Sequence, residues 1–177
     1  MADYDIPQTK VEQQACLDVI ASSQAINIIP TITTSAGIYS SGDNIGGLLT
    51  LSNATRIIGG TCMLDSIHVR DNLNQSAALS ILLFSSSPAT GATITDNAAF
   101  VYGTTAFTKQ IGIINVAALD YTTFNSKSSA SLSGLRRIMT AVGDVNLYAI
   151  VVTTGTPTYA ANATTLYIDF GFKLINF

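Results

Sequence analysis

The single histidine of the chain, His68, is the first residue to consider for catalysis. A nucleophilic serine needs a general base, and a Ser-His-Asp triad could use this histidine. However, the sequence contains no Gly-x-Ser-x-Gly motif, which exposes the nucleophile in α/β-hydrolases. His68 also alternates with Ile67 and Val69, as expected in a strand with one buried face. We therefore interpret His68 as a surface or interface histidine and predict no catalytic residue.

Carboxylates are the second candidate, because two of them can together hydrolyse a glycosidic bond. Most aspartates beyond the N-terminal section follow or precede Gly or Asn, where Asp is an ordinary turn residue. Glu12 is the only glutamate, and sequence alone pairs no two carboxylates in space. We predict that the protein is not an enzyme, and keep a glycan hydrolase using Asp96 and Asp120 as an alternative. The aspartates considered are Asp43, Asp65, Asp71, Asp96, Asp120, Asp144 and Asp169.

No metal or cofactor site is predicted. Zinc needs a cluster of Cys and His, whereas Cys16 and Cys62 lie far apart and are interpreted as free thiols. Calcium prefers several carboxylates in one loop, and Asp3 and Asp5 are the only close pair. An ion bound by three copies of one Asp on a symmetry axis stays open. The Gly-rich stretch 42–47 lacks a phosphate-binding motif and is interpreted as tight turns.

The composition predicts one domain with an uncharged polar surface. The chain has 177 residues, of which 11% are charged, and its 17 Ser and 22 Thr supply many surface hydroxyls. A net charge of −3 with scattered basic residues argues against a nucleic-acid partner. The uncharged stretches 19–42 and 145–168 are interrupted by Pro, Gly and Asn, so no membrane partner is predicted. The acidic N-terminus lacks an apolar signal region, and we expect assembly in a cytoplasm.

The first section of the chain, residues 1–36, is predicted to be an N-terminal arm. Val11, Ala15 and Val19 have helical spacing, which predicts a short helix near residues 9–23. Residues 26–32 are expected to be extended, and Pro30 excludes a central-strand position. Our hypothesis is that this arm lies on a neighbouring subunit or on the surface to which the protein binds.

Residues 37–177 are predicted to form an all-β, antiparallel, jelly-roll-like β-sandwich. Turn signals recur about every 8–12 residues, and β-branched residues are frequent. A Ser-rich connector is expected at 126–133, and a Gly143-Asp144 turn is expected to join strands 135–142 and 147–153 as a hairpin. The other expected strands are 48–51, 63–70, 77–84, 107–116, 120–124 and 166–174.

Several segments, in the same order, resemble small virion proteins of tailed bacteriophages. Ile-Tyr-Ser-Ser-Gly-Asp-Asn-Ile-Gly resembles their Tyr-x-x-Gly-Asp-x-(Ile/Val)-Gly opening, and an apolar strand followed by a Pro loop and Thr-Asp-Asn-Ala-Ala-Phe resembles a later block. The resemblance covers residues 38–116 well and does not include residues 1–35. The matching segments are 38–46, 56–71, 79–84 with Pro88, 95–100 and 111–114.

The resemblance implies a structural function without catalytic residues or cofactors. Where such proteins have a role, they usually decorate and stabilise the outside of the capsid as cement, commonly as homotrimers. The implied partner is the major capsid protein, and the implied location is the capsid surface of a virion assembled in the host cytoplasm. The alternative is a tail- or fibre-associated module that recognises a host receptor or glycan.

Overall fold

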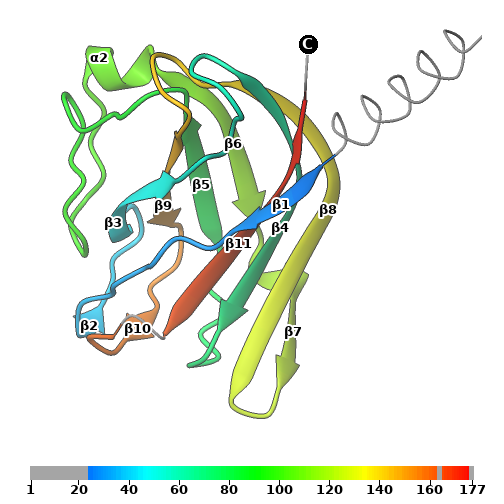
Figure 1. Ribbon diagram of the computed structural model, residues 1–177. Helices are drawn as coiled ribbons and strands as arrows, with labels where there is room; N and C mark the ends of the chain where they lie inside the picture. Colours follow the sequence, from blue (N-terminus) through cyan, green and yellow to red (C-terminus); the bar gives the residue numbers. More distant parts are fainter. Residues whose placement is uncertain (1–23, 163–164, 176–177) are drawn as a thin grey trace, which may run out of the picture.

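The computed structural model describes residues 24–162 and 165–175, which form a sandwich of two antiparallel sheets (Figure 1). The helix predicted near residues 9–23 lies outside the described residues. The elements are β1 (Ala25–Ile28), β2 (Gly37–Ile38), β3 (Asn44–Leu51), β4 (Thr61–Asp71), β5 (Leu79–Phe84), α2 (Thr104–Phe107), β6 (Gln110–Val116), η1 (Ala118–Asp120), β7 (Tyr121–Phe124), β8 (Lys127–Thr140), β9 (Leu147–Thr153), β10 (Thr158–Tyr159) and β11 (Leu166–Leu174).

The strand pairing is nested. One sheet has the order β1-β11-β4-β8-β7, the other has the order β3-β9-β5-β6, and β2 pairs with β10. The first strand pairs with the last, β3 with β9, β4 with β8, and β5 with β6, all antiparallel. The chain is therefore one long hairpin folded over on itself, which is the jelly-roll topology. This confirms the predicted fold class.

The sandwich has two distinct ends. We call the end formed by the loops 52–60 and 141–146, together with α2, the near end; it lies at the top of Figure 1. The opposite end, with β2, β10 and the β7–β8 turn, is the far end. The described chain begins at the near end, where the Leu174 N–H donates a 2.9 Å hydrogen bond to the Gln24 carbonyl.

The core lies between the sheets and follows the predicted alternation. In β4, Ile67 and Val69 are buried, as the sequence predicted. In β11, all five apolar residues of the predicted inner face are buried, because every second side chain of a strand points to the same face. These residues are Leu166, Ile168, Phe170, Phe172 and Leu174.

The prediction of a Ser-rich connector at 126–133 is wrong. Apart from the Asn125–Ser126 turn, this stretch forms the first half of β8, which pairs with both β4 and β7. Ser128 and Ala130 are buried, whereas Ser129 between them is only partly buried. Leu132 is the one large apolar residue on the inner face of this half-strand, and Ser128 and Ala130 are small, so the alternation in hydrophobicity is weak although the geometry is that of a strand.

The predicted hairpin of 135–142 with 147–153 is also wrong. The turn exists, and Gly143 has a φ of +73°. However, β8 pairs with β4 in one sheet, and β9 pairs with β3 and β5 in the other. The turn therefore connects the two sheets, because long-range pairing with β4 and β5 determines where the flanking strands lie. The strand predicted at 107–116 begins only at Gln110, because the preceding residues form α2.

Part of the predicted arm belongs to the sandwich in this structure. Residues 25–28 form β1, which pairs with β11 at the edge of the five-stranded sheet. Pro30 follows this strand, in agreement with the exclusion of a central position. Contacts of residues 1–36 with another subunit stay a prediction.

The long β5–β6 connection, residues 85–109, covers the outer face of the four-stranded sheet. It contributes Phe100 and Tyr102 to a second apolar cluster, whose buried members are Leu82, Phe84 and Ile150. The Phe100 and Tyr102 rings meet edge to face with their centroids 4.7 Å apart. The outer face of this sheet is therefore largely occupied, whereas that of the five-stranded sheet is polar.

Candidate interaction surfaces

His68 lies on the outer face of the five-stranded sheet, in register with Ser131 of β8 and Asp169 of β11. This row contains the residue types of a Ser-His-Asp triad. However, Nη2 of Arg70 donates a 2.7 Å hydrogen bond to the Asp169 carboxylate, and the guanidinium lies 5.1 Å from the centroid of the Tyr167 ring. Asp169 is thus held by Arg70, and the row lacks the contact with which a carboxylate orients a catalytic histidine.

Most of the aspartates considered as catalytic candidates instead bind a backbone N–H group or a basic side chain. Asp43, Asp120 and Asp144 each accept a backbone N–H hydrogen bond of 2.7 Å within their own turn, as predicted for turn residues. Asp65 forms an ion pair of 3.1 Å with Lys173. In residues 24–162 and 165–175, no three His, Cys, Asp or Glu side chains form a group that could hold a metal ion.

Asp96 joins three separate segments of the chain. Its carboxylate accepts hydrogen bonds from the Ser35 N–H at 2.7 Å, the Tyr39 hydroxyl at 2.8 Å and the Gly46 N–H at 2.6 Å, and from the Ser35 hydroxyl. The Tyr39 side chain is fully buried, and burial together with the neighbouring carboxylate raises its pKa. Asp96 therefore fixes the β5–β6 connection against the entry to β3, and its contacts are those of a structural residue.

Asp71 is buried at the end of β4. Its carboxylate accepts N–H hydrogen bonds of 2.9 to 3.1 Å from Leu73, Gln75 and Ser76, which fixes the turn after the strand. Burial raises the pKa of Asp71, although these hydrogen bonds act in the opposite direction. The Tyr159 hydroxyl lies 3.5 Å from the same carboxylate. This group stabilises the far end of the sandwich.

Cys62 is a buried thiol in β4. Burial raises its pKa to about 12, so the reactive thiolate is scarce at neutral pH. This agrees with its interpretation as a free thiol, and the side chain is fully buried where the sequence predicted partial burial. Cys16, Asp3, Asp5 and Glu12 lie outside the described residues.

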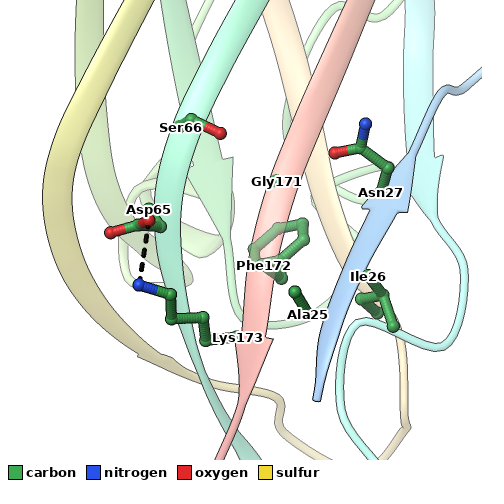
Figure 2. Close-up of a pocket in the computed structure, with 8 residues that line it drawn as sticks. All are labelled: Ala25, Ile26, Asn27, Asp65, Ser66, Gly171, Phe172 and Lys173. Carbon is green, nitrogen blue, oxygen red and sulfur yellow. Dashed lines mark ion pairs between the residues drawn. The ribbon is translucent and has the colours of Figure 1, made fainter. Parts of the chain in front are cut away.

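A shallow hollow of about 290 Å³ lies on the outer face of the five-stranded sheet (Figure 2). Gly171 forms its floor, and the Ser66 hydroxyl and Asn27 amide point toward this glycine from the neighbouring strands. Asp65 and Lys173 lie at one side as an ion pair. Register shifts near Asp65 and at Gly171 interrupt the regular pleat here. The lining residues are Ala25, Ile26, Asn27, Asp65, Ser66, Gly171, Phe172 and Lys173.

The near end exposes a group of apolar side chains, which we call the near-end patch. Ile57 and Ile58 occupy a tight turn closed by a 2.9 Å hydrogen bond from the Gly60 N–H to the Ile57 carbonyl, and are 67% and 73% exposed. Backbone hydrogen bonds connect this turn to the 141–146 loop, and that loop to Ser85. The members of the patch are Ile57, Ile58, Phe107, Ile138 and Val142.

The far end exposes a second group, the far-end patch. Leu119 in η1 is 97% exposed, and Phe124 lies at the β7–β8 turn. The loops here are tied together: the Thr158 N–H donates to the Gln75 side chain at 3.0 Å, and the Thr123 hydroxyl donates to Asn74 at 3.3 Å. The members of the patch are Ile38, Leu73, Leu119 and Phe124.

Charge is distributed unequally between the ends. The half of the sandwich toward the near end has five basic residues and two acidic ones, whereas the half toward the far end has two basic and five acidic ones. The near-end residues are Arg56, Lys109, Arg136, Arg137 and Lys173 with Asp65 and Asp144. The far-end residues are Arg70 and Lys127 with Asp43, Asp71, Asp96, Asp120 and Asp169.

Sequence reasoning did not identify either patch. The available signal was two adjacent isoleucines directly before Gly59-Gly60, since a glycine turn places neighbouring side chains at the surface. Leu119 gave no comparable signal, because a single leucine beside Asp120 is compatible with burial in a strand.

Of the comparisons with known proteins, only the one with solved structures finds a similarity, and it concerns the fold. No protein-family model matches the chain, and no curated protein sequence matches it. Solved structures with a similar fold include a chain of tomato aspermy virus (TM-score 0.41, 8% identity, 96% of this chain and 95% of that one) and a chain of infectious bursal disease virus, Gx strain (TM-score 0.38, 11% identity, 86% and 32%). A third is a chain of Desmodium yellow mottle tymovirus (TM-score 0.27, 12% identity, 87% and 82%).

These neighbours come from virus structures, but TM-scores of this size do not bear on function. The chain spans about a third of the length of its infectious bursal disease virus neighbour. In the part of the chain that the structure describes, no helix has the length and hydropathy of a membrane span.

Proposed function

We propose that this protein is a non-enzymatic virion protein that decorates and stabilises the outside of a tailed-phage capsid. The observation that supports this most directly is the exposed apolar patch at the far end of a jelly-roll sandwich. Isolated exposed apolar residues are common, but side chains such as Leu119, at 97% exposure, grouped on connected loops mark contact surfaces. The resemblance of residues 38–116 to small phage virion proteins supports the choice of a tailed-phage capsid as the assembly.

The far-end patch is the surface that we assign to the major capsid protein. Leu119 and Phe124 project from η1 and from the β7–β8 turn, where they reach a partner without rearrangement of the core. A protein that binds the assembled shell and not its dissociated subunits stabilises the shell by linkage. Association as a homotrimer would place three such patches on one side of the assembly, and so increase avidity.

The test is binding of the full-length chain to shells assembled from the major capsid protein. We expect binding, and a higher temperature of shell disruption by calorimetry. Leu119→Ser with Phe124→Ser should abolish both effects. Val101→Ser, which alters an exposed apolar residue of the β5–β6 connection, should leave both unchanged. Equal binding by the two variants, or no binding by the wild type, would contradict the proposal.

The hollow in Figure 2 favours a second candidate, a tail- or fibre-associated module that binds a glycan. Hydroxyl, amide, carboxylate and ammonium groups surround a glycine floor, and such groups can hydrogen-bond sugar hydroxyls. The number of copies per virion separates the two functions. Quantitative mass spectrometry of virions should find hundreds of copies for a cement protein and tens at most for a tail or fibre component.

A further inference from the structure

We infer that residues 1–23 dock onto the near-end patch of their own chain. The chain enters the sandwich beside this surface. Gln24 accepts a hydrogen bond from the Leu174 N–H through its carbonyl, and a 3.0 Å hydrogen bond from Nη2 of Arg56 through its side chain. Arg56 directly precedes Ile57 and Ile58. Residues 1–23 are therefore attached to the described chain, at Gln24, beside the near-end patch.

The two partners have opposite charge. Residues 1–23 contain four acidic side chains and one lysine, a side-chain charge of −3. The near-end half has five basic and two acidic residues, a charge of +3. Opposite charges favour association and determine its orientation more than its strength. The acidic residues are Asp3, Asp5, Glu12 and Asp18, and the lysine is Lys10.

The two partners also have complementary apolar groups. The segment contains Val11, Val19 and Ile20, and the patch offers two isoleucines that are about 70% exposed on a turn fixed by hydrogen bonds. Burial of such side chains against each other removes apolar area from water and stabilises the contact by about 25 cal/mol per Å². A rigid turn loses little conformational freedom when it is covered.

Tethering favours the chain's own segment over that of another copy. Docking within one chain is intramolecular, with an effective concentration in the millimolar range for short flexible connections. Twenty-three residues can span about 35 Å even when helical, which is enough to cross the end of a sandwich of this size. The near-end patch is therefore covered before any external partner arrives, while the far-end patch remains available.

The experiment places a nitroxide spin label on Cys16 of the full-length chain, since Cys62 is buried and unreactive. Isoleucine methyl NMR signals then report proximity to the label. We expect the signals of Ile57 and Ile58 to broaden and to recover when the nitroxide is reduced. The signal of Ile38 at the far end, which is 69% exposed, should not change. Equal broadening at both ends, or none at Ile57 and Ile58, would overturn the inference.

Two matched pairs of variants test whether apolar contact and charge attraction at the near end cause this broadening. Ile58→Ser should lose the broadening at Ile57, whereas Ile38→Ser should retain it. Arg137→Glu should weaken it, whereas Lys127→Glu, an equal charge change at the far end, should not. High salt should also weaken it, because screening shortens the range of the charges. An effect common to both members of a pair would contradict a contact specific to the near end.

A mixing experiment separates the chain's own segment from that of another copy. Spin-labelled chains without isotopes are mixed with isotope-labelled chains without a spin label. The inference predicts no broadening in this sample. Broadening of Ile57 and Ile58 there would show exchange of the segment between copies and would overturn docking on the same chain.

Discussion

Replacement of Asp96 by Asn tests whether one carboxylate fixes the β5–β6 connection. The wild-type carboxylate accepts four hydrogen bonds, from the N–H and hydroxyl of Ser35, the Tyr39 hydroxyl and the Gly46 N–H. Hydrogen bonds to a charged acceptor contribute about 1.5–3 kcal/mol each, and an amide can retain only part of this set. We therefore expect Asp96→Asn to lower the free energy of unfolding by about 3–5 kcal/mol, since the amide nitrogen would replace an acceptor oxygen and face donors that include the hydroxyl of the fully buried Tyr39.

The assay is chemical and thermal unfolding of the full-length chain. For a domain of this size the expected loss corresponds to a decrease in Tm of about 10 °C. Asp65→Asn is the control, because the ion pair of Asp65 with Lys173 is solvent-exposed and worth about 1 kcal/mol or less. If the two variants unfold at the same temperature, or Asp96→Asn loses less than about 1 kcal/mol, the assignment of Asp96 as a structural clamp is refuted.

Three further predictions concern single sites. Gly171→Ala should lower the free energy of unfolding by about 1 kcal/mol, because its Cβ would force the Ser66 hydroxyl out of its present rotamer. Gly112→Ala, whose Cβ meets nothing closer than 4.0 Å, should be neutral in the same thermal melts. Burial of Cys62 predicts that a thiol reagent modifies this cysteine only after denaturation, as located by mass spectrometry of peptides. Because burial raises the pKa of Asp71, its stabilising contribution is present below the unfolded value of 3.8 and is lost as the pH rises through the folded value. Urea titrations should show this pH dependence in the wild type and not in Asp71→Asn.

The fold class was predictable because the strongest patterns were those of buried strands. The alternation in residues 166–174 is regular, and β11 is an interior strand of the five-stranded sheet, between β1 and β4. Residues 126–133 were mistaken for a connector because mostly small residues fill the inner face of that half of β8. The false hairpin at Gly143 had a correct turn, but its strands pair with residues far away in the sequence. Local patterns report such turns and cannot report which sheet each strand joins.

The contact surfaces were less predictable than the fold, for a different reason. Hydropathy does not distinguish an exposed isoleucine in a loop from a buried one in a strand. Ile57 and Ile58 resemble the neighbouring core residues in type, and their exposure follows from the turn that the Gly60 N–H closes onto the Ile57 carbonyl. The turn roles of Asp43 and Asp144 were predictable, because an Asp that binds a nearby N–H needs only local geometry.

The nested pairing has a consequence for assembly. Because β1 pairs with β11, the described chain begins and ends side by side at the near end, which is also the basic end. A segment attached there is placed to cover that end, whereas the acidic far end has no such attachment in the described residues. The two ends therefore differ in charge and, if residues 1–23 cover the near end as inferred above, in how accessible their apolar side chains are to a partner. For the proposed decoration function, this polarity would orient the far-end patch toward the capsid.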